Sequence, residues 1–167
     1  MKLTAVERKK TSSIIRRANA NDIGVISEIE KTCFPELTAY PKRQLAYLIL
    51  KANSTALVET ENCTVRGFII VTYRKGSLIG NVETIDVDPR FQNLSVGISL
   101  LAAAEEDMKQ RGMKFAQLEV SERNEPAISL YQKAGYTIKQ RLVGFYRFEH
   151  NGTRDAIRMV KPLFKAP

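Results

Sequence analysis

The feature that most constrains the fold of this chain is a series of three β-rich runs with short connections between them. The runs extend from Thr55 to Glu59, from Val65 to Arg74 and from Leu78 to Val87. Their connections, TENC and KGS, are short enough for hairpins, so these strands are expected to pair antiparallel. Two strand–helix units follow, and such units need crossover connections. The sequence therefore predicts an α/β (α+β) fold with a mixed, mostly antiparallel seven-stranded sheet and helices on both faces.

The segment before these strands predicts a short strand and two helices. The strand is expected from Ile14 to Ala18. Asn21 is expected to cap the first helix, which ends near Cys33, and Pro41 suits the first turn of the second helix. The first helix would turn the apolar residues Ile23, Ile26 and Ile29 towards the core.

The C-terminal half predicts two further helices and three strands. The long helix before Gly112 is expected to bury Ile98, Leu101, Ala102 and Met108. A strand from Phe115 to Val120 and a helix from Asn124 to Gly135 should follow. The chain would end in a hairpin of two strands, Val143 to Glu149 and Thr153 to Val160, joined by the turn Asn151-Gly152.

One domain is expected, because 167 residues can bury one sizeable core. Residues 1–12 are expected to form a disordered basic tail and residues 13–167 the domain. The net charge of +8 is concentrated at the two ends, since residues 1–17 carry +5, residues 18–138 carry −2 and residues 139–167 carry +5. Nucleic acid is therefore not the expected partner, although proximity to the ribosome stays open.

Cysteine and histidine usage excludes several classes of site. Cys33 and Cys63 are too few for a disulfide framework or a multi-cysteine metal site, and they are expected to be free thiols in a reducing cytoplasm. His150 is the single histidine, so no metal is expected. No apolar run reaches the length of a membrane-spanning helix, and the N-terminus lacks the pattern of a secretory signal. A cytoplasmic protein without membrane contact, as a monomer or a homodimer, is expected.

The segment QNLSVG, from Gln92 to Gly97, joins a predicted strand to a predicted helix. The first N–H groups of a helix are unpaired and its N-terminus carries partial positive charge, so such a turn can bind a phosphate or pyrophosphate. Phosphate-binding turns often contain two or three glycines, and this turn has only Gly97. Taken alone, a polar turn before a helix is more often an ordinary connection, so both interpretations stay open at this point.

Further motifs accompany this turn. The block LEVSERNEPAISLYQKAGY, from Leu118 to Tyr136, follows a VDP motif and the pattern Gln92-x-x-Ser95-x-Gly97, and the pairs Phe145-Tyr146 and Asp155-Ala156 follow later. Together these motifs resemble the Gcn5-related N-acetyltransferase (GNAT) superfamily, and more narrowly its RimI-type and archaeal Ard-type protein N-terminal acetyltransferases. The resemblance extends from about Ile15 to Leu163. It departs from the family pattern at Ser95, where the family prefers glycine, and at Gly144, where relatives often carry asparagine before two tyrosines.

The resemblance implies acetyl-CoA as the cofactor. Backbone groups of Ile85, Asp86 and Val87 would contact its pantetheine arm like an added strand, and Asn124 and Tyr131 would also touch it. Ser95 would either strain the turn or donate its hydroxyl group to a phosphate oxygen, and the sequence leaves both open. The pyrophosphate would lie on the turn and the helix start, which comprise Gln92, Asn93, Leu94, Ser95, Val96, Gly97 and Ile98.

Acetyl transfer from a thioester to an amine needs a neutral amine near the carbonyl, a donor for the developing oxyanion and a proton for the leaving thiolate. The resemblance implies that the backbone N–H of Val87 is the oxyanion donor. It also implies that Glu119 is the general base, acting through water, and that Tyr131 is the acid. The pattern alone places Glu119 on the more solvated face of its strand and allows Tyr131 to be a core residue. A tyrosine with a pKa of about 10 keeps its proton at neutral pH and can donate it to a thiolate with a pKa of about 8.5.

The acceptor is expected to bind between two loops. Phe34, Pro35 and Tyr40 would line one wall and Tyr146 the other, although exposed loop aromatics can equally be packing over the core. The segments CFPELTAY and GFYRFEH contain only one glutamate each, so the carboxylate cluster that a polyamine needs is not expected.

These expectations combine into one predicted function with open alternatives. The predicted function is acetyl transfer from acetyl-CoA to a protein N-terminal α-amine, by direct attack in a ternary complex. One alternative is acetylation of a small-molecule amine such as a polyamine, an amino acid or an aminoglycoside. The other is a non-catalytic module that binds coenzyme A or docks on ribosomes.

Overall fold

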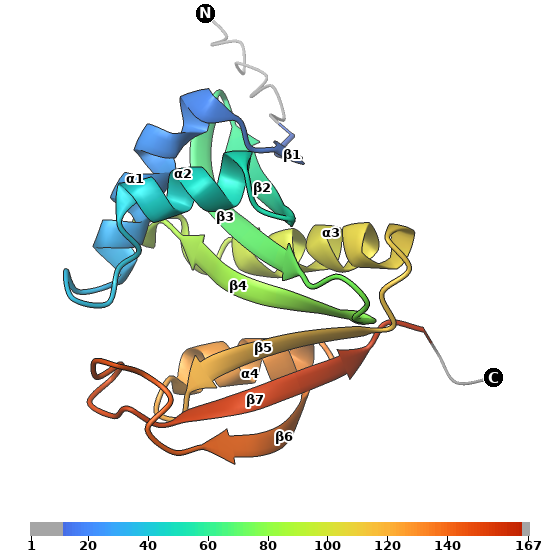
Figure 1. Cartoon of the computed structure of the whole chain (residues 1–167). Helices are drawn as coiled ribbons and strands as arrows, with labels where there is room; N and C mark the ends of the chain where they lie inside the picture. The colour runs from blue at the N-terminus through green and yellow to red at the C-terminus, as the bar shows by residue number, and fades with distance from the viewer. Residues whose placement is uncertain (1–11, 165–167) are drawn as a thin grey trace, which may run out of the picture.

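The computed structural model describes residues 12–164 and confirms the predicted order of strands and helices (Figure 1). The predicted basic tail lies outside the described residues except for Ser12. Two short 3-10 turns, Ala20–Asp22 and Pro89–Phe91, accompany the main elements. These elements are β1 (Ile14–Arg17), α1 (Ile23–Cys33), α2 (Lys42–Leu50), β2 (Ser54–Glu61), β3 (Thr64–Tyr73), β4 (Ile79–Val87), α3 (Val96–Gln110), β5 (Phe115–Ser121), α4 (Glu125–Lys133), β6 (Thr137–Leu142) and β7 (Ala156–Pro162).

The described strands form one seven-stranded sheet in the order β1-β2-β3-β4-β5-β7-β6. The pairing of β4 with β5 is parallel and the other pairings are antiparallel, which confirms the mixed, mostly antiparallel sheet. Helices α1 and α2 pack on one face of β2 and β3 around Ile26, Leu45 and Phe68. Helices α3 and α4 contribute to the core on the other face, around Leu100 and Tyr131. The sheet is therefore covered on both faces, as predicted.

Helix α3 faces the core with a different stripe from the one predicted. Leu100, Leu101, Ala104 and Met108 are buried, whereas Ile98 is 37% exposed and Ala102 is exposed. The prediction was wrong for Ile98 and Ala102 because they are four residues apart on one row of the helix surface, and that row is turned away from the sheet. No helix in residues 12–164 is long and apolar enough to span a membrane.

The entry to α1 also differs from the prediction. Asn21 does not cap α1, whose N-cap is Asp22 without a side-chain capping bond. Asn19 instead caps the 3-10 turn that leads into the helix: its side-chain oxygen accepts the N–H of Asn21 at 2.9 Å, and Asp22 Oδ2 accepts the N–H of Asn19 at 2.8 Å. Arg16 of β1 donates two hydrogen bonds of 2.8 Å to the same Asp22 carboxylate. This arrangement ties the first strand to the start of α1.

The predicted final hairpin is wrong in its first strand. The strand before the loop is Thr137–Leu142, and residues 143–155 form a loop rather than a strand. The turn at Asn151-Gly152 exists, with both residues at positive φ and His150 bridged to Thr153, but it lies inside this loop. Strand β6 is exposed along almost its whole length, so it lacks the apolar alternation by which strands are predicted. The aromatic residues that suggested a strand lie in the loop instead.

Strands β4 and β5 pair over only part of their lengths. Their register covers Ile79 to Val82 of β4 and Phe115 to Leu118 of β5. A β-bulge at Glu83, the one residue between the partners of Ile70 and Val71, then changes the direction of β4. Beyond this point the two strands diverge, and the sheet opens into a wedge (Figure 1).

Candidate active site between strands β4 and β5

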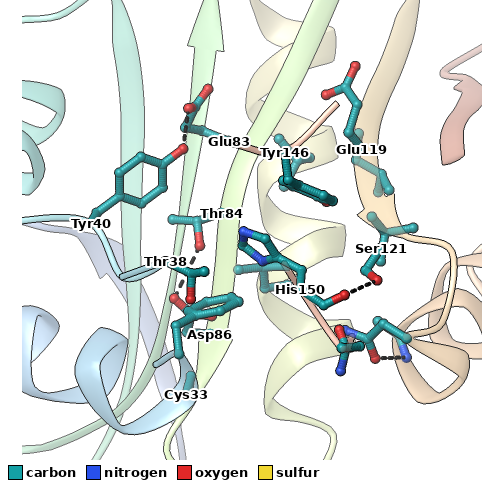
Figure 2. A pocket seen from close by; sticks show the side chains of 18 of the residues that line it. Cys33, Thr38, Tyr40, Glu83, Thr84, Asp86, Glu119, Ser121, Tyr146 and His150 are labelled. Atoms are coloured by element: carbon teal, nitrogen blue, oxygen red, sulfur yellow. Dashed lines mark hydrogen bonds between the residues drawn. The ribbon is translucent and has the colours of Figure 1, made fainter. Parts of the chain in front are cut away.

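A cavity of about 760 Å³ occupies the wedge. It is lined by β4 and β5, by the ends of α1 and α4, and by two loops, α1–α2 (residues 34–41) and β6–β7 (residues 143–155). Figure 2 shows residues of both strands and both loops directed into it. The cavity therefore brings together parts of the chain that are far apart in sequence.

The edge of β4 that borders the cavity carries free backbone groups. The N–H of Asp88 donates to the carbonyl of Arg66 in β3 at 2.9 Å. Because successive residues of a strand point their amides to opposite sides, the amides of Val87 and Ile85 point away from β3, towards the open edge. The amide of Asp86 points towards β3, so of the three residues expected to make backbone contacts with the cofactor, only Val87 and Ile85 offer such groups to the wedge.

The N-terminus of α3 forms a second set of free donors. The first intrahelical bond runs from the N–H of Ser99 to the carbonyl of Ser95 at 3.1 Å. The N–H groups of Val96, Gly97 and Ile98 accordingly have no protein partner within residues 12–164. Gln92, at the start of the turn before α3, lines the cavity, and its side chain donates to the carbonyl of Val87 at 3.4 Å. The turn therefore begins at the cavity and ends at the N-terminus of α3. An anionic group fits this end of the site.

Two residues of this turn have left-handed backbone conformations. Ser95, the N-cap of α3, has φ 62° and ψ 14°, and Asn93 has φ 60°. Asparagine tolerates this region, whereas serine is strained in it relative to glycine. The hydroxyl group of Ser95 makes no capping hydrogen bond in the described structure. Leu94 between them is 56% exposed.

Glu119 and Tyr131 both line the cavity. Glu119 Oε1 accepts hydrogen bonds from Arg158 Nε at 2.8 Å and from Gln117 at 3.3 Å. The Tyr131 ring is buried, 6.0 Å from the ring of Tyr136. Burial, reinforced by nearby negative charge, raises the pKa of Tyr131, so the phenol remains protonated. The fold thus places the carboxyl group of Glu119 and the protonated phenol of Tyr131 on the wall of the same cavity.

Asn124 is the N-cap of α4, as predicted, and it also lines the cavity. Its side-chain oxygen accepts the N–H of Ala127 at 3.3 Å. Because this bond uses only the oxygen, the amide NH₂ is free to donate. The residue is thus placed to serve both the helix and a ligand.

Three of the four residues expected to contact the acceptor line the cavity. Tyr40 donates to Glu83 Oε1 at 2.6 Å, and Tyr146 stacks on His150 with ring centroids 4.0 Å apart (Figure 2). Phe34 packs edge-on against the same His150 at 6.1 Å. Pro35 does not line the cavity, and its carbonyl accepts N–H groups within the loop instead.

Comparison with known proteins decides the family. The model of the acetyltransferase (GNAT) family matches residues 24–136. The chain belongs to the GNAT family. This membership confirms the predicted resemblance and fold, and family members transfer acetyl groups from acetyl-CoA to amines.

The chain is also similar to individual acetyltransferases. An N-alpha-acetyltransferase of Sulfurisphaera tokodaii is 28% identical over 160 residues, which are 89% of this chain and 92% of the relative. The catalytic subunit of the N-terminal acetyltransferase B complex of Saccharomyces cerevisiae is 32% identical over 82 residues, 48% of this chain but only 42% of the subunit. The solved ribosomal-protein-S18-alanine N-acetyltransferase of Escherichia coli has a TM-score of 0.80 at 23% identity, covering 93% of this chain and 97% of that one.

The GNAT cavity of this chain contains carboxyl groups that the sequence did not predict. Glu30, Glu83, Asp86 and Glu119 all line it, although neither loop contributes a carboxyl group to the lining, as expected. That expectation considered only the loops, whereas these groups project from α1, β4 and β5. Of these four residues, the sequence analysis had singled out Glu119 for the chemistry of its side chain and Asp86 for a backbone contact with the cofactor.

His150 is a further lining residue, which the sequence singled out only as the single histidine. Ser121 donates to its carbonyl at 2.8 Å. Burial lowers the pKa of His150, so its ring is neutral near pH 7. A serine in a strand is too common to have indicated this contact, and Ser121 and His150 are 29 residues apart in the sequence.

Proposed function

We propose that this GNAT protein acetylates the N-terminal α-amine of polypeptide chains. The observation that carries the proposal is the contrast between the floor and the rim of the cavity. By the floor we mean the buried lining residues Glu30 and Asp86, which carry carboxyl groups, and by the rim the exposed apolar lining residues Leu37, Phe145 and Phe148. An N-terminus has one cationic group followed by a largely neutral chain, which matches an acidic floor below an apolar rim.

The two loops support an extended acceptor. Leu37 is 71% exposed, Phe145 46% and Phe148 40%, so the rim offers apolar surface to a first side chain. The β6–β7 loop is held by side chains: Asp155 accepts the N–H of Gly144 at 2.7 Å, and Arg154 donates to the carbonyl of Tyr146 at 2.8 Å. A loop held in this way can position a peptide rather than merely cover the core.

The chemistry follows from the groups around the cavity. Acetyl-CoA supplies the acetyl group as a thioester. The N–H of Val87 is directed where an oxyanion can accept it. Glu119 is the proposed general base, acting through water, and Tyr131 the proposed acid for the thiolate.

Direct attack in a ternary complex is favoured over an acetyl-enzyme intermediate. The cavity contains one cysteine, Cys33, whose thiol donates to the carbonyl of Val87 at 3.4 Å. Burial and neighbouring carboxyl groups raise the pKa of Cys33 to about 12. The thiol therefore stays protonated at neutral pH and is a poor nucleophile.

The similarity to named N-alpha-acetyltransferases supports a RimI-like role on newly made proteins. The free thiols Cys33 and Cys63 are consistent with the proposed cytoplasmic location. Proximity to the ribosome and a monomeric or homodimeric state are further parts of this proposal.

A second candidate function is acetylation of a polyamine. The four carboxyl groups of the cavity favour it, because they could bind several ammonium groups. Two of them, however, are already bonded: Glu83 accepts from Tyr40, and Glu119 accepts from Arg158. The apolar rim also has no role for a polyamine.

A competition assay separates the two candidates. Free thiol release from acetyl-CoA is followed with peptides varied at their first two residues, with spermidine and with free amino acids. We expect the best peptide to have a higher kcat/KM than spermidine and to be acetylated on its α-amine, as seen by mass spectrometry. Faster acetylation of spermidine than of every peptide would refute the N-terminal proposal, and no thiol release with any amine would favour a binding module.

A further inference from the structure

Two carboxyl groups that the proposed mechanism does not use are buried in the lining of the cavity and interact with each other. Glu30 of α1 is 1% exposed and Asp86 of β4 is 4% exposed, and both line the cavity. We call these two residues the carboxyl pair. The pair comes from elements on either side of the α1–α2 loop, so it forms only in the folded chain.

The hydrogen bonds around the carboxyl pair leave a fully buried oxygen of Glu30 without a donor among residues 12–164. Glu30 Oε1 accepts the N–H of Tyr40 at 2.9 Å, and Asp86 Oδ2 accepts the hydroxyl group of Thr84 at 3.1 Å. Glu30 Oε2 is buried and receives no hydrogen bond from any donor within residues 12–164. A proton shared between the two carboxyl groups would supply the missing bond.

Burial dictates how many protons the pair holds. Two buried carboxylates in contact cannot both be ionised, because each loses its hydration and repels the other. Burial first, and then the hydrogen bond and charge of Glu30, raise the pKa of Asp86 well above its usual range. The pair therefore holds one proton and one negative charge at neutral pH, like the paired carboxyl groups of aspartic proteases.

The neighbouring titratable groups do not compete for another proton. Cys33, Tyr40, Tyr131 and Tyr146 all have raised pKa values and keep their own protons, and burial keeps His150 neutral. Arg147 is a cationic side chain on the wall of the cavity. The carboxylates of Glu83 and Glu119 are bonded to Tyr40 and Arg158 respectively.

We propose that the carboxyl pair, rather than Glu119, takes up the proton that the acceptor ammonium group must lose before it attacks, which leaves to Glu119 the proton that the nitrogen loses after the attack. The inference rests on the proposed function, because it concerns the amine bound in the same cavity. An N–H bond of the ammonium group breaks, and an O–H bond forms on the unprotonated oxygen of the pair. The pair changes from one negative charge to none, and the freed nitrogen lone pair attacks the acetyl carbon. The proton that the pair has taken up then leaves to solvent through the opening of the cavity, and the pair again carries one negative charge.

The test is the pH dependence of kcat/KM for Asp86→Asn and Glu30→Gln, each of which keeps the shape of its side chain but replaces one carboxylate oxygen by an amide NH₂ group, so that the side chain cannot take up a proton. At pH 6.5 an α-amine is mostly protonated, and we expect each variant to lose about 100-fold, the usual contribution of a general base. At pH 9.5 solution already deprotonates the amine, and the loss should fall below about 3-fold. Glu28→Gln is the matched control, because Glu28 lies on the same helix but bonds Lys31 at the surface.

A purely structural role predicts a different result. Such a role would lower kcat/KM by the same factor at both pH values, and that outcome would overturn the proposal. The proposal would also be overturned if both variants had the pH dependence of kcat/KM of the wild-type protein. It would likewise be overturned if Glu119→Gln lost activity mainly at low pH and neither variant did. Should Asp86→Asn not fold, Glu30→Gln alone decides, because it leaves the strand unchanged.

Failure of the proposed function can be recognised separately. If the wild-type protein acetylates spermidine and no peptide, the acceptor class is wrong, and the comparison is then made with spermidine, with the upper pH raised above about 10.4, the pKa of an alkyl ammonium group. Any ammonium acceptor must lose a proton before it attacks, so the expected loss at low pH and the results that contradict it stay the same.

Discussion

The phenolic oxygen of Tyr40 lies 2.6 Å from Oε1 of Glu83, so the α1–α2 loop is bonded to the bulge residue of β4. Burial raises the pKa of Tyr40, and the phenol therefore remains a donor across the working pH range. This bond connects a wall of the cavity to the strand that carries the free backbone amides. Its loss should alter acceptor binding before it alters the fold.

Tyr40→Phe removes only the hydroxyl group. We expect the KM for a peptide acceptor to rise about 10-fold, equivalent to about 1.4 kcal/mol, with a smaller effect on kcat. Steady-state thiol release measures both parameters. Tyr47→Phe is the control, since Tyr47 is 59% exposed on α2 and should leave both unchanged. An unchanged KM in Tyr40→Phe would assign this bond no part in acceptor binding.

Ser95→Gly should stabilise the protein. Serine at φ 62° is strained by roughly 1 kcal/mol relative to glycine, and thermal unfolding should register a gain of that order. Ser99→Gly, one turn later in α3, should instead lower stability because it lies within the helix. Calorimetry with acetyl-CoA then separates the two interpretations of Ser95, since tighter binding indicates strain and weaker binding indicates a lost phosphate contact.

Tyr131→Phe should lower kcat more than it lowers affinity for coenzyme A. The phenol donates its proton as the thiolate leaves, so its main effect is on the transition state. Because burial raises its pKa, wild-type activity should show no alkaline loss from ionisation of Tyr131 below about pH 10. The comparison is Tyr136→Phe, whose ring lies 6.0 Å from Tyr131 but does not line the cavity. Equal kcat losses in the two variants would point to packing instead of acid catalysis.

Ser121→Ala should loosen the β6–β7 loop. The Ser121 hydroxyl group donates to the carbonyl of His150 at 2.8 Å, and His150 carries the stacked ring of Tyr146. We expect a rise of several-fold in acceptor KM, with affinity for coenzyme A unchanged. Ser129→Ala is the control, because Ser129 is exposed on α4. A loss confined to coenzyme A affinity would contradict this role.

Asp22→Asn should lower stability in a pH-dependent way. The hydrogen bonds from Arg16, with the N–H of Asn19, lower the pKa of Asp22. A lowered folded-state pKa contributes stability above the unfolded-state value of about 3.9, and that contribution disappears as the pH falls through the folded-state pKa. Urea unfolding should show a loss of about 1 to 2 kcal/mol at pH 7 and little difference at pH 2. A difference that stays constant with pH would exclude the ion pair as its cause.

The sequence predicted most of the fold because most elements carry a local signal. The hairpins β2–β3 and β3–β4, the α4 cap at Asn124 and the turn before α3 could all be identified from residue types and spacing. Strand β6 could not, because an exposed edge strand has no apolar alternation. The bulge at Glu83 could not either, since it is visible only in the pairing of β4 with β3.

The candidate site was predicted where motifs are local. Glu119 and Tyr131 were indicated by one contiguous block, and the structure brings both to the same cavity. The carboxyl pair of Glu30 and Asp86 was not indicated, because its two members are far apart in the sequence and each alone reads as an ordinary acidic residue. Only the packing of α1 on β4 brings them into contact.

The short register between β4 and β5 has a mechanical consequence. Across the middle of the sheet, four residue pairs join the N-terminal strands to the C-terminal ones, and the remaining length of β4 is unpaired on that side. A ligand lying along this edge would contact both halves of the sheet and stabilise the folded state, because it binds only when both halves are in place. The amount of cofactor in the cell would then set not only how fast the enzyme works but also how long each molecule survives heat and proteases.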